Sequence, residues 1–196
     1  PQKIMIVLGI MSTLIGGIGG INQTQLRKLM AYSSLANLGW MMVIFSMSRN
    51  MAVLSIFTYI IMSIPTFLLM EKMMLKTLQD VTTAWTTSTT ANIMLTLMFL
   101  SLSGLPPLTG FAPKLLILNE LVLENFTSIA TMMAIMSLLN LFFYMRTTYI
   151  MTMTTPPPPP SIMIKWRHKP YYHKLLPTLI IMSLMSVPLL PTITAM

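Results

Sequence analysis

A single lysine stands inside one of the most apolar parts of the chain, directly after a break in a predicted helix. Residues 101–120 are SLSGLPPLTGFAPKLLILNE, and Lys114 follows paired prolines and repeated glycines. Such residues remove backbone hydrogen bonds from a helix, and in lipid only protein or a wet cavity can replace those bonds. A charged side chain at that depth costs about 2.5–3.5 kcal/mol on insertion scales and indicates function. A broken helix beside a buried base is typical of ion and proton carriers.

The chemistry that such a lysine offers is proton transfer. An amine held away from water loses the hydration of its ammonium form, so it can release a proton as well as accept one. Ser101, Ser103 and Thr109 offer polarity nearby, together with carbonyls that the break leaves free. Glu120 lies about 9 Å further along a helix; it is either an acceptor on an exit path or a residue at the headgroup boundary. The alternative for Lys114 is snorkelling from a helix end, which the apolar runs on both sides disfavour.

Composition indicates a membrane protein and excludes several kinds of chemistry. Apolar residues make up 55% of the chain and charged residues 8%, whereas a soluble domain carries about a quarter charged residues. The chain has no cysteine, which excludes disulfides and iron–sulfur ligation by its own thiolates. His168 and His173 have no acid at ligand spacing, so we expect no metal site. We also expect no nucleic-acid partner, because the net charge of +8 is divided among short loops.

The apolar segments predict an all-α polytopic membrane protein with six transmembrane helices. We expect the fourth helix to be discontinuous, because it contains the proline break and is too long for one crossing of about 20 residues. Pro65 predicts a kink in the third helix, and residues 71–91 are expected to be a surface loop that could contain a short interfacial helix. The predicted spans are residues 4–21, 31–47, 51–70, 92–123, 126–150 and 175–196.

A long loop, residues 151–174, separates the last two predicted spans. Residues 156–160 are consecutive prolines, which predict a stiff polyproline II spacer of about 15 Å. Residues 165–174 are KWRHKPYYHK, and this mixture of basic and aromatic side chains beside a membrane favours anionic lipid or a partner protein over nucleic acid.

The basic residues also predict an orientation. With six spans, all of them except Lys3, Arg49 and the buried Lys114 fall on one face of the membrane. By the positive-inside rule this face is the cytoplasm, or the matrix of a mitochondrion.

Two motifs resemble a known family. Residues 22–42, NQTQLRKLMAYSSLANLGWMM, and residues 102–114, LSGLPPLTGFAPK, resemble the chain 2 family of mitochondrial NADH–ubiquinone oxidoreductase, an antiporter-like membrane subunit of respiratory complex I. LLNLFFYMRTTY at residues 138–149 and Lys165–Trp166 also fit. The resemblance extends over essentially the whole chain and is to the carboxyl-terminal portion of the family. Because the chain opens at Pro1 rather than methionine, we expect that an amino-terminal portion is missing.

The resemblance implies a fold and a site. Residues 1–150 are then the second five-helix repeat of an antiporter-like subunit, residues 151–174 a matrix-side loop and residues 175–196 the final helix. The fourth span becomes the discontinuous helix of the repeat, and Lys114 matches the proton-transferring lysine of the family. Asn37 departs from the family, in which relatives commonly carry histidine at the matching position, so this helix lacks that protonatable group.

The resemblance also implies partners and cofactors. The chain itself is expected to bind none, because NADH, FMN, the iron–sulfur clusters and ubiquinone belong to other parts of the assembled complex. Expected partners are other membrane-arm subunits of complex I, including neighbouring antiporter-like subunits, and lipids such as cardiolipin. The expected location is the mitochondrial inner membrane, with the basic loops on the matrix side.

Three functions remain open from the sequence. The first is a core membrane subunit of proton-pumping NADH:ubiquinone oxidoreductase, with Lys114 as the proton carrier and no redox site of its own. The second is a cation/proton antiporter subunit, for which a sodium site would need a carboxylate in the core; none is evident in this chain. The third is a structural scaffold of a membrane arm, in which Lys114 would be dispensable.

Overall fold

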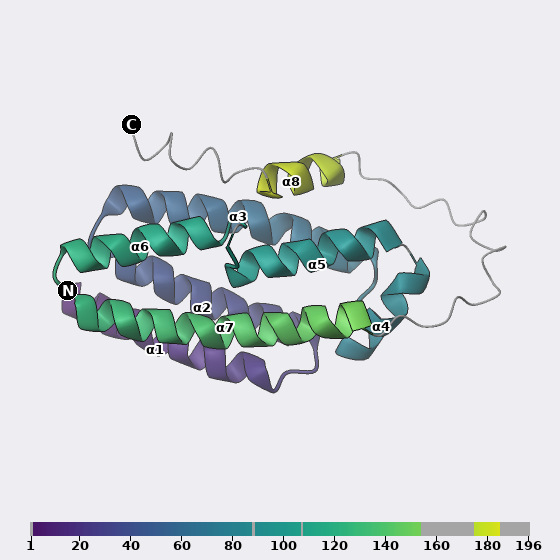
Figure 1. Cartoon of the computed structure of the whole chain (residues 1–196), viewed down its shortest axis with the longest axis horizontal. Coiled ribbons are helices and arrows are strands. Elements are labelled where there is room, and N and C mark those ends of the chain that lie inside the picture. Colours follow the sequence, from purple (N-terminus) through teal and green to yellow (C-terminus); the bar gives the residue numbers. More distant parts are fainter. Residues whose placement is uncertain (1, 88, 107, 154–174, 185–196) are drawn as a thin grey trace.

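The computed structural model describes residues 2–87, 89–106, 108–153 and 175–184, and these residues form helices and no strand (Figure 1). The helices are α1 (Gln2–Ile21), α2 (Leu26–Phe45), α3 (Arg49–Lys72), α4 (Leu78–Thr87), α5 (Thr89–Ser103), α6 (Phe111–Leu123), α7 (Thr127–Met153) and α8 (Leu175–Leu184). In Figure 1, α1, α2, α3 and α7 run back and forth along the long axis, and α5 and α6 follow each other nearly end to end. The predicted all-helical fold is confirmed for the described residues.

The helices of the structure differ from the predicted spans in their bounds. By length and composition, α1, α3 and α7 are able to cross a membrane, and α5 is a shorter apolar helix. The predicted fourth span consists of two helices, α5 and α6, separated by a joint of residues 104–110, of which residue 107 is not described. α8 ends at Leu184. The remainder of the predicted last span, the proline run, the basic-aromatic stretch and both histidines lie outside the described residues.

α2 begins earlier than the predicted span at residues 31–47. Its first turns place Leu26, Leu29 and Met30 at helical spacing, with exposed fractions of 0%, 2% and 2%. Arg27 and Lys28 occupy the opposite, exposed side of these turns. An apolar face is enough to keep a polar turn helical when it packs against a core. The basic residues therefore belong to the helix and not to the preceding loop.

α4 begins with a reciprocal pair of hydrogen bonds between Thr77 and Asp80. The Asp80 N–H donates to the Thr77 hydroxyl oxygen at 3.3 Å, and the Thr77 N–H donates to the Asp80 carboxylate at 2.7 Å. This is a capping box, which satisfies two N–H groups that a helix start leaves unpaired. Residues 71–91 are therefore not only a loop, since they contain a helix of 10 residues.

Protonation of Asp80 is expected to weaken this cap. Hydrogen bonds from the Thr77 N–H and then the Lys76 N–H lower the pKa of Asp80 from its ordinary value of 3.8. A carboxyl with a lowered pKa stabilises the fold above pH 3.8 and loses that contribution as the pH falls through the lowered value. We expect Asp80→Asn to lower the thermal unfolding midpoint in detergent at about pH 6 but not below the lowered pKa. A difference that stays constant with pH would contradict the role of the carboxylate.

Three helices end through a turn with the same hydrogen bonds. At the end of α5, the Gly104 N–H binds the Ser101 carbonyl at 3.1 Å and the Leu105 N–H binds the Leu100 carbonyl at 3.5 Å. This pattern is a Schellman motif, which satisfies carbonyls in the last turn of a helix and places one residue at positive φ. Among the described residues, positive φ occurs at Met74 after α3 (54°), Gly104 after α5 (84°) and Asn125 after α6 (64°).

Met74 is poorly suited to its position. A residue other than Gly, Asn or Asp in the left-handed region costs about 1–2 kcal/mol, and the Met74 side chain is 77% exposed, so packing returns little. We expect Met74→Gly to raise the free energy of unfolding by about 1 kcal/mol, measured as a higher unfolding midpoint in detergent. Asn125→Gly is the matched control and should gain less, because asparagine already tolerates this conformation. A lower midpoint for Met74→Gly would show that Met74 makes a compensating contact.

The connections α1–α2 and α3–α4 are joined to each other at one end of the bundle. An isolated antiparallel bridge pairs Gln25 with Thr77. Two backbone hydrogen bonds of 3.0 Å complete this connection bridge: Leu26 N–H to the Lys76 carbonyl and Leu78 N–H to the Thr24 carbonyl. From α7, Arg146 donates to the Ile21 carbonyl at the end of α1. This end of the bundle is therefore held by polar contacts between segments far apart in sequence.

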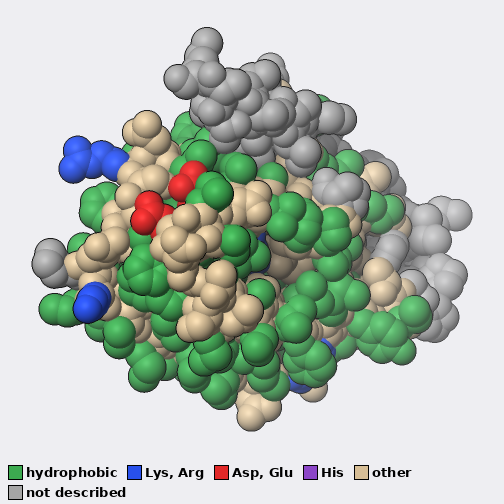
Figure 2. Space-filling model, turned by 60° about the vertical axis from the view of Figure 1, so that its left-hand side comes forward, with side chains coloured by type: hydrophobic (Ala, Val, Ile, Leu, Met, Phe, Trp, Pro, Cys, Tyr) green, Lys and Arg blue, Asp and Glu red, His purple; other side chains and the backbone are tan. Residues whose placement is uncertain are grey.

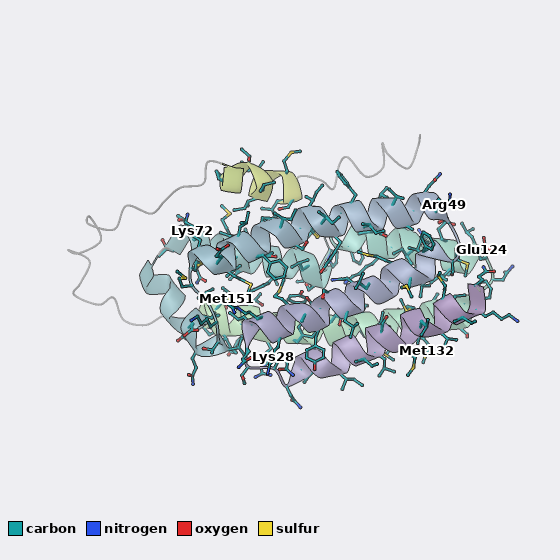
Figure 3. All side chains as sticks on the ribbon, turned by 180° about the vertical axis from the view of Figure 1, so that it is seen from behind. Lys28, Arg49, Lys72, Glu124, Met132 and Met151 are labelled. Atoms are coloured by element: carbon teal, nitrogen blue, oxygen red, sulfur yellow. The ribbon has the colours of Figure 1, made fainter. Side chains whose placement is uncertain are left out.

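The outer surface is largely apolar. Hydrophobic side chains cover most of the face seen in Figure 2, and large ones such as Phe57, Leu138 and Phe142 are more than half exposed, at 58%, 61% and 55%. Figure 3 shows Lys28 and Lys72 toward one end of the bundle, and Arg49 and Glu124 toward the other. Apolar flanks with charges at helix ends are the arrangement that a bilayer demands.

Candidate functional site

Lys114 lies in α6 and reaches back across the joint to the end of α5. Its Nζ donates a hydrogen bond of 2.9 Å to the carbonyl oxygen of Ser103, the last residue of α5. The last carbonyls of a helix have no partner within the helix and carry the negative end of its dipole, which favours a cation there. The break in the helix therefore supplies the ammonium group with an acceptor inside the bundle.

Two glycines give the joint its tight shape. A Cβ atom at Gly104 would lie 2.9 Å from Lys114 Nζ and 3.2 Å from its Cδ, and the φ of 84° disfavours any side chain there. A Cβ atom at Gly110 would overlap the backbone carbonyl oxygen of Ser101. Pro113 falls in the first turn of α6, where proline costs no intrahelical hydrogen bond. The glycines and the proline that interrupt the apolar sequence thus position Lys114.

A cavity of about 40 Å³ lies beside Lys114, lined by residues of α2, α3, α5 and α6 and by Gly110. A space of about 10–15 Å³ accommodates one water molecule, so this cavity has room for a few. The Trp40 Nε1 is buried, and no described residue accepts a hydrogen bond from it. The polar side chains that line the cavity are Asn37, Trp40, Ser55, Thr58, Tyr59 and Lys114.

The cavity lies between two apolar clusters. The smaller cluster joins α2, α3, α6 and α7: Trp40, Val43, Ile44, Ala52, Ile117, Leu121, Ala130 and Met133. The larger cluster occupies the half of the bundle near the connection bridge and includes Leu26, Leu69, Leu78, Leu95 and Phe99. The cavity lining shares Trp40 and Ile117 with the first cluster and Met62 and Leu102 with the second. Polar side chains and apolar side chains of both clusters therefore line the cavity together.

The predicted polar neighbours are only partly brought to Lys114. Ser103 contacts it through the backbone carbonyl, while the Ser103 hydroxyl donates to the Leu100 carbonyl at 2.6 Å. The Ser101 hydroxyl donates to the carbonyl of Met98 at 2.8 Å. Thr109 is fully buried, and its Oγ1 has no hydrogen-bond partner among the described residues. The carbonyl that the break leaves free, and not the serine hydroxyls, is what Lys114 binds.

The remaining predicted residues divide between the cavity and the helix beyond it. Asn37 lines the cavity. Glu120 is partly buried in α6 and is not among the lining residues, so the structure does not bring it to the cavity.

Sequence reasoning missed Trp40, Thr58 and Tyr59. A signal was present, since residues 55, 58, 59 and 62 have the spacing of one helix face. No three His, Asp or Glu side chains within the described ranges lie together as a metal site would need.

Comparisons with known proteins agree with this architecture. The family model described as NADH:quinone oxidoreductase/Mrp antiporter, TM, matches residues 1–143, and the model of the NADH dehydrogenase subunit 2 C-terminus matches residues 141–194. NADH-ubiquinone oxidoreductase chain 2 of Latimeria chalumnae is 47% identical over 192 residues, which cover 97% of this chain and 55% of the relative. The chain thus spans about half the length of this relative.

Two solved structures share the fold. A chain of respiratory complex I from Thermus thermophilus superposes with a TM-score of 0.77 at 19% identity, covering 98% of this chain and 44% of that chain. A chain of the Mrp complex from Dietzia sp. DQ12-45-1b superposes with a TM-score of 0.71 at 12% identity, covering 98% and 46%. The family resemblance predicted from the two motifs is confirmed, and the chain belongs to the NADH:quinone oxidoreductase/Mrp antiporter family of transmembrane proteins.

Proposed function

We propose that the chain is part of a core membrane subunit of proton-pumping NADH:ubiquinone oxidoreductase, complex I, and contributes to proton translocation across the mitochondrial inner membrane. The observation that carries the proposal is the ammonium group of Lys114, held on the Ser103 carbonyl beside a cavity that is lined in part by polar side chains and lies between two apolar clusters. The name of the Latimeria relative and the match to its carboxyl-terminal family model support the identity of the complex. NADH, FMN, iron–sulfur clusters and ubiquinone would act elsewhere in that complex.

In this proposal Lys114 is the proton-transferring residue. Water in the cavity, hydrogen-bonded to Asn37, Thr58 and Tyr59, would exchange protons with the amine. The two apolar clusters favour this role, because packed hydrocarbon on both sides of the site opposes leakage of protons past it. Glu120, which follows Lys114 along α6, is proposed as an acceptor on the exit side.

The topology proposed for the whole chain has six crossings. α5 and α6 together form one discontinuous crossing, residues 1–150 form a five-helix repeat, and residues 175–196 form the final helix after the loop at 151–174. In Figure 1, α1, α2, α3, the α5–α6 pair and α7 run in alternating directions along the long axis, and this alternation supports the count. Lys28 and Lys72 at one end (Figure 3) favour that end as the matrix side. Proposed partners are the other membrane-arm subunits, including antiporter-like ones, and lipids such as cardiolipin.

A cation/proton antiporter subunit is the second candidate, because the fold is shared with a chain of the Mrp complex. The cavity disfavours it, since its lining contains Lys114 and no carboxylate, whereas a sodium ion prefers acidic ligands in a membrane core. A structural scaffold of the membrane arm is the third candidate and predicts that Lys114 is dispensable.

The test of the proposed function is Lys114→Met in the assembled complex, reconstituted in vesicles. The measured quantity is the number of protons translocated per NADH oxidised. A lower ratio in a fully assembled complex supports a proton-carrying lysine, and an unchanged ratio makes this chain a scaffold.

A further inference from the structure

The turn after α5 leaves the carbonyl of Ser103 to Lys114. The Schellman hydrogen bonds from Gly104 and Leu105 satisfy the carbonyls of Ser101 and Leu100. The carbonyl of Ser103, at the very end of the helix, receives the Lys114 ammonium instead, at 2.9 Å. The amine therefore completes a backbone cap that begins with two N–H groups, and it does so from the other side of the joint.

We propose that Lys114 is a charge-dependent cap of α5, so that loss of its proton loosens the joint between α5 and α6. The inference rests on the proposed proton-transferring role of Lys114 and adds to it a regulation of the same site. An ionised donor makes a hydrogen bond roughly twice as strong as a neutral one. The cation also interacts favourably with the carboxyl end of the helix dipole. A neutral amine loses the interaction with the dipole and about half of the strength of the hydrogen bond.

The surroundings of Lys114 contain little that would replace its charge. From α2 the cavity lining contributes Asn37 and Trp40, and from α3 it contributes Ser55, Thr58 and Tyr59, of which only Tyr59 is titratable. The parts of α7 in the smaller cluster with α6 are the apolar Ala130 and Met133. On α6 itself the next charged residue is Glu120, outside the lining. A change in the charge of Lys114 therefore acts most directly on its hydrogen bond to the Ser103 carbonyl.

The joint is too tightly packed to accommodate a change in the charge of Lys114 without moving. Gly104 and Gly110 both sit where an added Cβ atom would meet its neighbours, one against Lys114 and the other against the Ser101 carbonyl. A weaker cap at Ser103 would therefore change the contact between the two helices and not only the charge in the cavity. Proton transfer at Lys114 then becomes a change in backbone geometry, which can reach residues beyond the site.

Amide hydrogen exchange tests the inference directly. The probes are the Gly104 and Leu105 N–H groups of the cap in the assembled complex, in membranes. The matched control is the same motif after α6, in which Asn125 N–H binds the Val122 carbonyl at 3.1 Å and Phe126 N–H binds the Leu121 carbonyl at 2.9 Å. In Lys114→Met we expect protection at the α5 cap to fall about tenfold, with the α6 control unchanged. In the unmodified protein, protection relative to the control should fall as the pH rises, while Lys114→Arg, always charged, should stay protected.

Each outcome supports or overturns the proposal. Equal protection at the α5 cap in Lys114→Met and in the unmodified protein at neutral pH would overturn it, as would a difference that does not shrink at high pH. If Lys114→Arg does not assemble, the pH dependence of protection in the unmodified protein decides whether the cap depends on charge. If Lys114→Met loses proton pumping but keeps full protection, the proposed function is supported and the proposed cap is contradicted. If the variant loses protection but pumps normally, Lys114 is a structural cap of α5 and the proposed function is contradicted.

Discussion

Lys114→Met is expected to slow proton transfer through this chain by about 10²-fold or more, the usual cost of removing a group that accepts and releases a proton. Methionine keeps the length and the apolar stem of the side chain but cannot carry a proton or bind the Ser103 carbonyl. The measurement is the rate of proton uptake into vesicles relative to NADH oxidation. The amount of assembled complex on a native gel shows that the variant is incorporated.

Two control variants distinguish proton transfer by Lys114 from the effect of its charge and from the loss of any lysine. Lys28→Met removes an exposed lysine at one end of the bundle and should leave the ratio of protons to NADH unchanged. Lys114→Arg keeps a positive charge but does not release its proton, so it should also lose transfer. Normal pumping in the arginine variant would show that Lys114 contributes only its charge. Normal pumping in the methionine variant would show that it contributes neither.

Gly110→Ala is expected to prevent normal assembly, with a loss of about 3 kcal/mol in the free energy of unfolding. The new methyl group would overlap the carbonyl oxygen of Ser101, a backbone atom that cannot rotate away, so α5 and α6 would have to separate. The measurement is the yield of assembled complex and its thermal unfolding midpoint.

Gly19→Ala is the matched control for crowding. A methyl group there would meet the ring of Tyr32, which is partly exposed and can turn, and the gain in helix propensity from glycine to alanine is about 1 kcal/mol. We expect its unfolding midpoint to stay within a few degrees of the unmodified protein. Normal assembly of Gly110→Ala would show that the joint is looser than its geometry implies.

The sequence was most informative where chemistry and backbone breaks coincide. Lys114 could be selected because an apolar run, two prolines and repeated glycines surround it, and these are strong local signals. The acceptor of its hydrogen bond could not be identified in the same way. The serine hydroxyls look like partners in the sequence, but each is used by a carbonyl of its own helix, and only the backbone path decides which carbonyl remains free.

Helix ends were the least predictable part of the fold. The turn after α3 places Met74 at positive φ. Glycine is the residue that usually occupies this conformation, so a methionine there gives no sign in the sequence that a helix ends. The start of α4 did carry a signal, the Thr77 and Asp80 spacing of a capping box, which the threonine-rich composition obscured. The spacing of residues 55, 58, 59 and 62 places them on one face of α3, but that this face borders the cavity depends on how α2, α3 and α6 pack together, which the spacing does not show.

The bridge between Gln25 and Thr77 has a consequence for biosynthesis. When the α1–α2 hairpin leaves the ribosome, the turn that closes it is incomplete, because the N–H of Leu26 and the carbonyl of Thr24 pair with Lys76 and Leu78, which are translated later. Until then the two groups need water at the membrane surface as their hydrogen-bond partner. This end of the bundle is therefore completed only after the start of α4 has been made.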